Sequence, residues 1–303
     1  MKKKNRNFLF DCGLFKINWK FMHEYHNQKS HKLPRALNNA IELFFYKKLV
    51  GKFIRTIDID SLPIFTHIEI ETINRCNGVC RFCPVNSTTD QRPYTRMPTH
   101  LFKKIVTNLS SLNYNGTICL FSNNEPFIDN RITEFCYYTR KTLPNARIVL
   151  YTNGSLLTIN LLREIEKYVD LLVINDYEIF DLSDLKEYYD KFLKENSKIF
   201  FSKRNYSEVR TSRGGKAPNK INASSINAAC LYPFKQLVVR PDGKCSLCCN
   251  DALGLYTLGD LSNSSLQDIW YSKSYRVIRT KMIKSKRENL ELCNSCDTAN
   301  LIP

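Results

Sequence analysis

The stretch that most constrains this chain is residues 67–84, where a short alternating segment runs directly into a loop with three cysteines. Residues 67–73 alternate polar and apolar side chains, which predicts a β-strand. Cys76, Cys80 and Cys83 follow with C-x3-C-x2-C spacing. Three thiolates on one loop can hold three corners of a four-iron cluster and leave the fourth iron open. Electron-transfer clusters and structural zinc sites instead take four protein ligands. Two interpretations follow: a cluster with an open iron, or a zinc loop whose fourth ligand lies elsewhere.

The predicted strand also carries two candidates for substrate contact. Alternation places His67, Glu69 and Glu71 on one face of the strand and isoleucines near the other. Parallel strands that are buried on both faces usually read apolar throughout. A polar face therefore indicates a wet cavity, such as the lumen of a barrel. We expect Glu69 and Glu71 to contact a substrate near the cysteine loop, although an edge strand facing water would show the same pattern.

Composition limits the classes of protein to which the chain can belong. Its 303 residues suffice for one large domain or two. No apolar run is long enough to span a bilayer, and the basic start of the chain is followed by polar residues rather than by the apolar core of a signal peptide. Twelve cysteines in such a chain indicate reduced thiols that bind metal, and hence a cytoplasmic location.

The N-terminal end of the chain is strongly basic. Residues 1–55 hold thirteen lysines and arginines against three acidic residues, within a net charge of +16. Residues 34–55 are predicted to form a helix with an apolar stripe and lysines on the opposite face. Such a helix packs on a neighbouring domain or lies on an anionic membrane surface. A basic head can also attract RNA, but a solvated basic surface explains the pattern as well, and we expect no nucleic-acid partner.

Helices and strands are predicted to alternate from residue 99 to residue 202. The predicted helices cover 99–111, 130–142, 158–168 and 181–195, with Thr99 and Thr158 as caps, and the predicted strands cover 117–121, 146–151, 171–175 and 197–202. This alternation indicates a parallel sheet with helices outside. The chain is too short for eight units, so we expect a partial barrel. Functional groups in such folds lie at the carboxyl ends of strands, where the cysteine loop, 123–125, Asn153 and Asn175 fall.

Residues 202–229 are rich in Ser, Asn and Gly and are predicted to form a linker. Within it, Arg213 is followed by Gly214 and Gly215. Two glycines let the backbone turn sharply and project a fixed cation, and the planar guanidinium suits hydroxyls or carboxylates. A plain linker would also account for this composition.

A second group of cysteines lies in the C-terminal third of the chain. Cys230 precedes an apolar strand and the turn 241–244, which predicts a hairpin. Three cysteines follow the turn and two more lie far downstream: Cys245, Cys248, Cys249, Cys293 and Cys296. A hairpin pair plus a distant C-x2-C gives a closed site of four thiolates, and spacing alone suits zinc as well as an iron–sulfur cluster. We expect Cys12, Cys119 and Cys136 to be core or surface thiols.

The C-x3-C-x2-C loop after a first strand, with Phe82 before the last cysteine, resembles the radical S-adenosylmethionine (SAM) superfamily. The resemblance implies that SAM chelates the open iron of a [4Fe–4S] cluster. One electron then cleaves SAM to methionine and a 5′-deoxyadenosyl radical, which removes a hydrogen atom from substrate. It further implies that SAM lies against Phe82, Asn123, Asn124, Glu125, Asn153 and Asn175. Asn123 and Asn124 stand where the family usually has two glycines, and the tolerance of Asn for unusual backbone angles can preserve the site.

The second cysteine group resembles the SPASM/twitch extension of the same superfamily, which holds an auxiliary [4Fe–4S] cluster. The resemblance rests on Gly243 five residues before Cys248, on helix signals at 259–261 and 268–270, and on the final C-x2-C. No cysteine follows Cys296, which favours a single auxiliary cluster. By this register the implied ligands are Cys230, Cys248, Cys293 and Cys296, with Cys245 and Cys249 as competitors.

These observations predict an α/β fold, a partial (β/α)6-type radical SAM barrel with a small C-terminal hairpin-plus-helix domain for the auxiliary cluster. The expected domains are a basic extension at 1–62, a core at 63–225 and an auxiliary domain at 226–303. The resemblance implies a radical SAM oxidoreductase. In family dehydrogenases that oxidise a sugar-like alcohol, a linker Arg and a first-strand Glu contact substrate, which gives those roles to Arg213 and Glu69, with Glu71 as a further candidate.

The expected partners are a small-molecule substrate, sugar-like or anionic, or a peptide, together with a reduced electron donor such as flavodoxin or ferredoxin. Two alternatives stay open. Many SPASM proteins modify ribosomal peptides, although residues 1–62 are short for a leader-binding domain. A non-enzymatic iron–sulfur or zinc protein that binds RNA through its basic head is the other, and it would show a steep salt dependence of RNA affinity.

Overall fold

The computed structural model describes residues 8–11, 16–18, 51–86, 90–193, 198–220, 226 and 228–298. The chain divides into two compact units, 1–52 and 53–303. In the first unit, β1 (Phe8–Asp11) pairs antiparallel with β2 (Lys16–Asn18). Most of the predicted helix at 34–55 and Cys12 lie outside the described residues. Only the end of that helix is described, as α3 (Gly51–Arg55).

The second unit is built on an eight-stranded sheet with the order β10-β9-β8-β3-β4-β5-β6-β7. Its strands are β3 (His67–Ile70), β4 (Thr117–Cys119), β5 (Arg147–Thr152), β6 (Leu171–Asp176), β7 (Ile199–Lys203), β8 (Gln236–Val239), β9 (Lys244–Ser246) and β10 (Thr257–Asp260). Strands β3 to β7 are parallel, β8 adds a sixth parallel strand beside β3, and β9 and β10 are antiparallel. Among the described residues no pairing joins β7 to β10, so the predicted partial barrel is confirmed.

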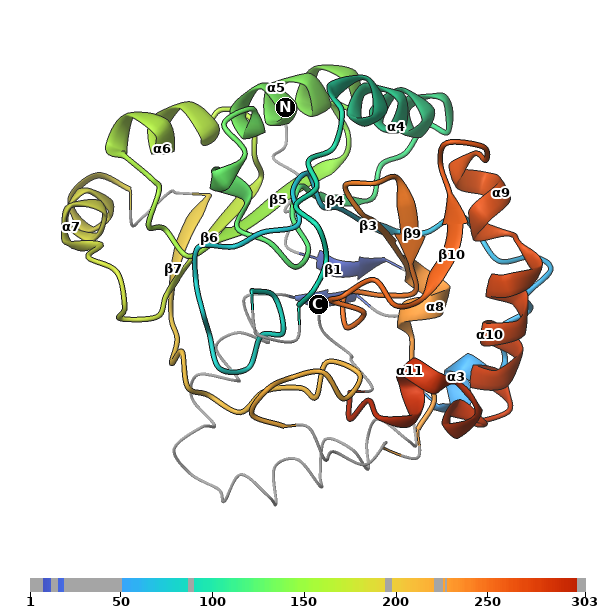
Figure 1. Ribbon diagram of the computed structural model, residues 1–303. Coiled ribbons are helices and arrows are strands. Elements are labelled where there is room, and N and C mark those ends of the chain that lie inside the picture. The colour runs from blue at the N-terminus through green and yellow to red at the C-terminus, as the bar shows by residue number, and fades with distance from the viewer. Residues whose placement is uncertain are drawn as a thin grey trace. The chain divides into compact units, whose positions relative to one another are not determined.

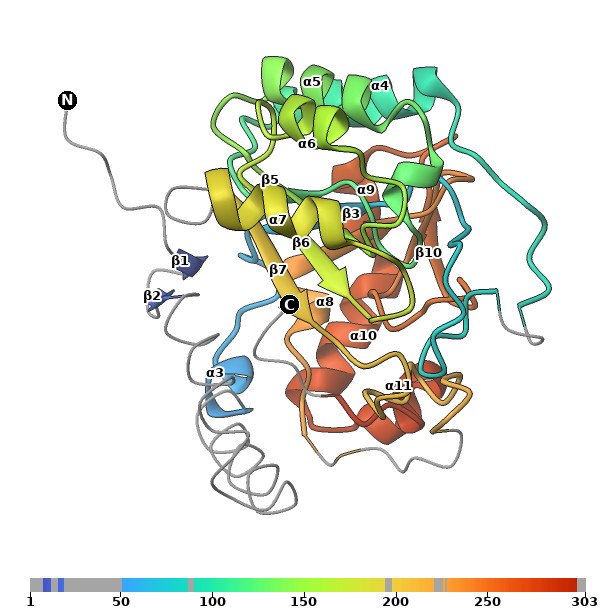
Figure 2. The ribbon, with the colours of Figure 1, turned by 90° about the vertical axis from the view of Figure 1, so that its left-hand side faces the viewer.

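Four helices connect the parallel strands and lie outside the sheet (Figure 1). They are α4 (Thr99–Ser111), α5 (Ile132–Thr142), α6 (Ile159–Ile165) and α7 (Ser183–Phe192). Helix α4 buries Phe102, Ile105, Val106 and Leu109, the spacing of a single apolar stripe. The Phe102 ring stacks on Phe135 of α5 with centroids 4.0 Å apart. Figure 2 shows α4, α5 and α6 side by side over the strands.

The two faces of the sheet differ in polarity, as the alternation in the first strand predicts. Neighbours in register share a face, so Glu69 lies on the same face as its partner Cys119. The opposite face carries Ile68, Ile118 and Ile148, all fully buried. The helices therefore cover an apolar face, and the inner face is free to carry the polar groups of a site.

The C-terminal part begins with α8 (Tyr232–Lys235) and the hairpin of β8 and β9. The predicted turn is confirmed: Gly243 has a φ of +82° and its amide donates to the Arg240 carbonyl at 2.9 Å. Beyond β10 come α9 (Leu266–Trp270), α10 (Lys273–Ile283), the 3-10 turn η3 (Arg287–Asn289) and α11 (Glu291–Asn294). The indole of Trp270 is fully buried, and its N–H donates to the Pro63 carbonyl at 3.0 Å.

The structure corrects three local predictions. Pro98, not Thr99, is the N-cap of α4, since Thr99 is already the first helical residue, and the Thr99 hydroxyl accepts a hydrogen bond from Arg131. Strand β3 ends at Ile70 rather than at residue 73, and Ile73 forms only an isolated bridge with Arg96. The expected helix signal at 259–261 falls on β10, whose pairing with β9 holds it extended, and α9 begins later at a capping box on Ser265.

The expected boundary at residue 226 is not a break in the sheet, because β8 pairs with β3 throughout its length. The three expected domain ranges stay predictions. No helix in the described part of the chain is long and apolar enough to cross a membrane.

Candidate active site and second cysteine site

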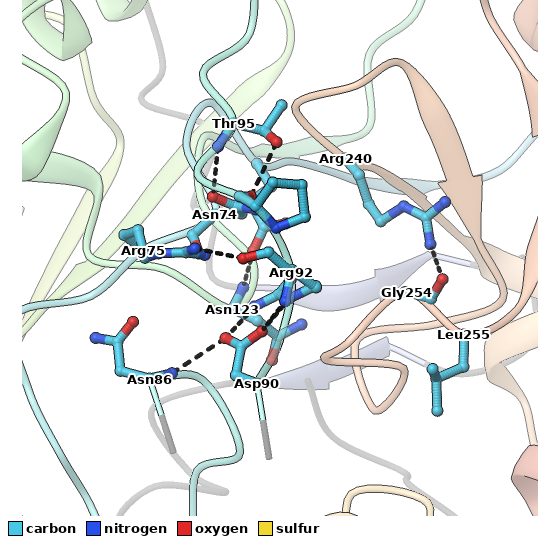
Figure 3. A network of polar contacts seen from close by, with 12 residues as sticks. Asn74, Arg75, Asn86, Asp90, Arg92, Thr95, Asn123, Arg240, Gly254 and Leu255 are labelled. Atoms are coloured by element: carbon cyan, nitrogen blue, oxygen red, sulfur yellow. Dashed lines mark hydrogen bonds and ion pairs between the residues drawn. The ribbon is translucent and has the colours of Figure 1, made fainter. Parts of the chain in front are cut away.

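The loop with the first three cysteines is clamped to the segment that follows it, as Figure 3 shows. Asn74 Nδ2 donates to the Pro93 carbonyl at 2.8 Å, and Asn74 Oδ1 accepts from the Thr95 amide at 2.9 Å. The neighbouring Arg75 guanidinium donates to the Arg92 carbonyl. These contacts fix the point where the chain enters the loop.

Asp90 fixes the far side of the same loop. Arg92 donates to both carboxylate oxygens, from Nε at 2.8 Å and from Nη2 at 2.9 Å, and the Asn86 amide donates at 3.1 Å. Asn86 Nδ2 in turn donates to the Cys76 carbonyl. Burial alone would raise the pKa of Asp90, but the hydrogen bonds from Arg92 and Asn86 hold that pKa below its usual value. The charged carboxylate therefore ties the exit of the loop back to its first cysteine.

The three cysteines open into a cleft at the carboxyl ends of the parallel strands. The cleft encloses about 830 Å³ of empty space, including the part open to solvent. All six SAM-binding candidates from the sequence line it: Phe82, Asn123, Asn124, Glu125, Asn153 and Asn175. Of the three catalytic candidates, Arg213 lines the cleft. A cavity of this volume with several polar groups suits a cofactor or small molecule.

Glu125 is held rigidly at the floor of the cleft. Its carboxylate accepts from the Thr152 hydroxyl at 2.6 Å, from the Asn153 amide at 2.8 Å and from the Phe127 amide at 3.3 Å. Burial raises the pKa of Glu125 to about 7 in spite of these bonds. The carboxylate thus joins the end of β5 to the loop after β4.

The two asparagines before Glu125 play different parts. Asn123 lines the cleft and is tied to its wall: its Nδ2 donates to the Cys249 carbonyl at 3.0 Å and its amide donates to Glu71 at 3.1 Å. Asn124 accepts from the Ser122 amide at 2.9 Å, while its buried Nδ2 has no partner among the described residues. A buried amide donor beside the cleft is costly unless a ligand accepts its hydrogen bond, so the site fits a polar cofactor.

Asn153 couples the end of β5 to the cysteine loop. Its Nδ2 donates to Asn77 Oδ1 at 2.8 Å, and its Oδ1 accepts from the Ser155 hydroxyl at 2.6 Å. Asn77 Nδ2 closes the triangle by donating to Ser155 Oγ at 2.7 Å. Sequence reasoning missed Asn77 and Ser155. Asn77 could have been noticed because it lies inside the cysteine motif. Ser155 could not, because it lies 78 positions further along the chain.

Phe82 forms one wall of the cleft with two residues that the sequence did not single out. The Tyr177 ring lies 6.0 Å from the Phe82 ring, and the Arg210 guanidinium lies 5.5 Å above it. The two rings are tilted by 37° to each other, and together with the guanidinium they give this wall both an aromatic and a cationic part. Neither Tyr177 nor Arg210 belongs to a local motif, so nothing in the sequence marks them.

Arg213 reaches the cleft from a left-handed turn in the predicted linker. Arg213, Gly214 and Gly215 have φ values of +49°, +62° and +80°. A Cβ on Gly214 would lie 2.4 Å from the Leu292 side chain, so only glycine fits there. Strain at Arg213, of about 1–2 kcal/mol for an L-residue, points to a function of the site. Its Nη1 donates to Asn123 Oδ1 at 3.0 Å and to the Cys249 carbonyl at 3.1 Å.

Glu69 and Glu71 lie one layer beneath the residues that line the cleft. Glu69 accepts from Ser122 Oγ and from Gln236 Nε2, each at 2.6 Å, and lies 3.3 Å from His67 Nε2. The Ser122 hydroxyl lines the cleft above it. Burial raises the pKa of Glu71 to about 7. Their role in substrate contact stays a prediction, and Ser122 is the group through which Glu69 reaches the cleft.

The second cysteine site is a cavity lined by buried residues, with about 310 Å³ of empty space including any part open to solvent. Its lining includes all four cysteines expected as auxiliary ligands: Cys230, Cys248, Cys293 and Cys296. Cys245 and Cys249 do not line it. Cys245 lies on β9, and Cys249 is next to Glu69, Arg213 and Gln236. Cys119 and Cys136 are buried in the core, as expected.

Both sites have the chemistry that iron–sulfur clusters require. Burial raises the pKa of Cys76 to about 12, of Cys80 to about 11 and of Cys293 to about 12. A thiolate there is stable only beside a positive centre such as iron. Among the described residues no three side chains converge as they would on one metal ion.

Two family models match this chain. Residues 70–197 match the radical SAM superfamily, and residues 230–297 match SPASM, an iron–sulfur cluster-binding domain. The S-adenosyl-L-methionine-dependent 2-deoxy-scyllo-inosamine dehydrogenase of Niallia circulans is 26% identical over 238 residues, which cover 78% of this chain and 95% of that protein.

Solved structures agree with these matches. The crystal structure of BtrN in complex with AdoMet and 2-DOIA is similar with a TM-score of 0.69 and 25% identity, over 78% of this chain and 94% of that chain. Streptococcus suis SuiB bound to precursor peptide SuiA has a TM-score of 0.56 and 13% identity, over 86% of this chain and 78% of that chain, and shares the fold alone. The chain therefore belongs to the radical SAM superfamily, as an oxidoreductase that uses SAM with a [4Fe–4S] cluster and carries a SPASM domain for an auxiliary iron–sulfur cluster.

Proposed function

We propose that this protein is a radical SAM dehydrogenase that oxidises an alcohol carbon of a small, sugar-like substrate, such as an aminocyclitol. One observation carries the proposal: Cys249 links the wall of the cleft to the closed cysteine cavity. The Cys249 carbonyl accepts hydrogen bonds from Asn123 and Arg213, which line the cleft, and Cys249 follows the cavity residue Cys248. A substrate on Arg213 would thus lie beside both cofactors. The relative from Niallia circulans is a dehydrogenase by name, which supports the same reaction.

Each set of residues has one task in this proposal. Cys76, Cys80 and Cys83 hold the catalytic cluster, and Cys230, Cys248, Cys293 and Cys296 hold the auxiliary cluster. When bound, these cofactors supply a radical that removes a hydrogen atom and an acceptor for one electron. Phe82, Asn124, Glu125, Asn153 and Asn175 position SAM, with Asn123 shaping the wall. Arg213 donates hydrogen bonds to substrate hydroxyls.

The oxidation balances in atoms and electrons. Substrate carbon loses one hydrogen atom, its hydroxyl loses one proton, and the remaining electron leaves toward the auxiliary site. Ser122 and Glu69 are the proposed route for the proton, because the Ser122 hydroxyl lines the cleft and donates to the Glu69 carboxylate at 2.6 Å. Glu71 is a second buried acid near this route, and it accepts a hydrogen bond from the Asn123 amide. A reduced electron donor such as flavodoxin or ferredoxin supplies the electron that begins each turnover.

The first experiment measures iron, sulfide and zinc after anaerobic reconstitution, then adds SAM and dithionite and measures 5′-deoxyadenosine. We expect about eight irons per chain, from two four-iron clusters. Aminocyclitols and related polyols deuterated at each carbinol carbon are then supplied one at a time. Deuterium in 5′-deoxyadenosine together with a ketone product supports the proposal. Cleavage of SAM with deuterium transfer but no ketone would replace oxidation by another radical reaction.

A further inference from the structure

Arg287 is a buried cation in the wall of the closed cysteine cavity. It opens η3 (Arg287–Asn289), its residue is 3% exposed, and it lines the cavity with the four cysteines. A guanidinium is almost never buried without a partner. Its surroundings must therefore supply compensation for its charge.

The guanidinium of Arg287 donates hydrogen bonds to the backbone at Cys293 and Cys296 and to the backbone just before Cys230. Nε donates to the Cys293 carbonyl at 3.2 Å and Nη2 donates to the Cys296 carbonyl at 2.9 Å. Nη1 donates to the Ala228 carbonyl at 3.4 Å, two residues before Cys230. One side chain thus links two stretches of chain that are some sixty residues apart, and its charge is held at a fixed place beside the cavity.

The four cavity cysteines, rather than a carboxylate, are the side chains that share this cavity wall with the guanidinium. No ion pair joins Arg287 to an acidic side chain among the described residues, so the thiolates of the cysteines are its available charge partners. Two other charges act on the same thiols: Lys235 lies near Cys230, and Asp251 lies near Cys293. Lys235 and Asp251 have opposite charges and stay in place when Arg287 alone is substituted. A change in potential in that variant therefore reports the loss of the Arg287 charge.

We infer that Arg287 raises the reduction potential of the auxiliary cluster and thereby lets that cluster accept the second electron of the proposed oxidation. Reduction adds one negative charge to a cluster that already carries four thiolates. A fixed cation nearby stabilises the reduced form more than the oxidised form, and net charge around a cluster is one of the factors that set its potential. The inference rests on the proposed function for its purpose, but the potential itself is measured without substrate.

Arg279 provides a matched control in the same part of the chain. It is 1% exposed and donates from Nε to the Pro233 carbonyl at 2.8 Å and from Nη1 to the Trp270 carbonyl at 2.7 Å. Its guanidinium lies 4.1 Å from the Trp270 ring centroid, and it does not line the cavity. Arg279 therefore shares burial and backbone hydrogen bonds with Arg287 but not the neighbouring thiols.

The experiment uses the full chain with Cys76, Cys80 and Cys83 replaced by Ala. The catalytic cluster is then absent, and the measured signal comes from the auxiliary cluster. Iron is counted, and the cluster is titrated with reductant while its electron paramagnetic resonance signal is followed. We expect Arg287→Gln to lower the equilibrium constant for reduction at least tenfold, about 59 mV for a one-electron couple. Arg287→Lys keeps the charge and should stay nearer the unsubstituted value, and Arg279→Gln should leave the potential unchanged.

An unchanged potential in Arg287→Gln with full iron content would overturn the inference, as would an equal shift in Arg279→Gln. If Arg287→Gln does not retain the cluster, Arg287→Lys decides: a potential close to the unsubstituted value supports the charge account, and a fall as large as tenfold contradicts it. Failure of the proposed function shows separately, as absence of ketone from the otherwise intact enzyme. A shifted potential without alcohol oxidation would keep the electrostatic role of Arg287 and reject dehydrogenation.

Discussion

The two cysteine sites differ in how many thiols they offer and in how open they are. The cleft presents three half-buried cysteines with polar neighbours, including an amide donor on Asn124 that lacks a protein partner. The second cavity presents four buried cysteines, and its other lining residues are buried as well. Three ligands with free space leave one iron for a reacting molecule, whereas four ligands in a closed site suit electron transfer. Under the proposed function, ligand count and access together divide radical generation from electron acceptance within one chain.

The largest expected effect separates the two sites directly. Cys80→Ala should abolish 5′-deoxyadenosine formation and lower iron from about eight to about four per chain, since one four-iron cluster is lost. Cys248→Ala should lose the same amount of iron but retain SAM cleavage. Iron analysis and chromatographic measurement of 5′-deoxyadenosine check both. Equal loss of cleavage in the two variants would remove the division of labour between the sites.

Adjacent cysteines sharpen the description of the closed site. Cys248→Ala should lose the auxiliary cluster, whereas Cys249→Ala and Cys245→Ala should keep about eight irons, because neither side chain lines the cavity. Thermal unfolding of the same variants should show the largest loss of stability for Cys248→Ala, since metal binding contributes to folding. Loss of four irons in Cys249→Ala instead would mean that the cavity as described does not contain the right fourth ligand.

The contact between the cleft and the segment of the second cysteine site, made by Arg213 with the Cys249 carbonyl, is tested by Arg213→Lys. A lysine keeps the charge but cannot make two hydrogen bonds with the fixed geometry of a guanidinium. Loss of one hydrogen bond from a charged group costs about 1.5–3 kcal/mol, so kcat/KM for the alcohol should fall about 10- to 150-fold. Cleavage of SAM without substrate should change little. An equal fall in alcohol oxidation and in SAM cleavage would mean that Arg213 acts on SAM rather than on the substrate.

The smallest expected effect concerns the rigidity of the open site. Asn77→Ala removes hydrogen bonds with Asn153 and Ser155 that join the cysteine loop to the end of β5. We expect the equivalent of one such hydrogen bond, about 0.5–1.5 kcal/mol, to be lost from SAM binding, so SAM affinity should weaken about 2- to 12-fold. Isothermal titration calorimetry under anaerobic conditions measures it. Asn160→Ala, at an exposed position on α6, is the control. An equal loss of SAM affinity in that variant would mean that the hydrogen bonds of Asn77 have no specific role.

Local pattern was enough for much of the fold. The βα alternation from residue 99 onward, the hairpin at 241–244 and the Thr158 cap are confirmed. Helix ends were less certain, because side-chain partners decide them: Thr99 accepts a hydrogen bond from Arg131, 32 positions away, instead of capping α4. The Gly-Asp at 259–260 reads as a helix signal alone and forms a strand only when β9 is beside it.

By itself, the sequence determined the motif of three cysteines and the parallel alternating core, since these follow from spacing and periodicity, and its resemblance to a known family named six of the residues that line the cleft. Tertiary structure decided which distant groups meet. Cys248 lines the closed cavity while its neighbour Cys249 lies by Glu69, and Glu69 lies under Ser122 rather than in the cleft. Tyr177, Arg210 and Arg287 gained their places in the same way. Convergence of side chains depends on the packing of the whole sheet, which no local window of sequence contains.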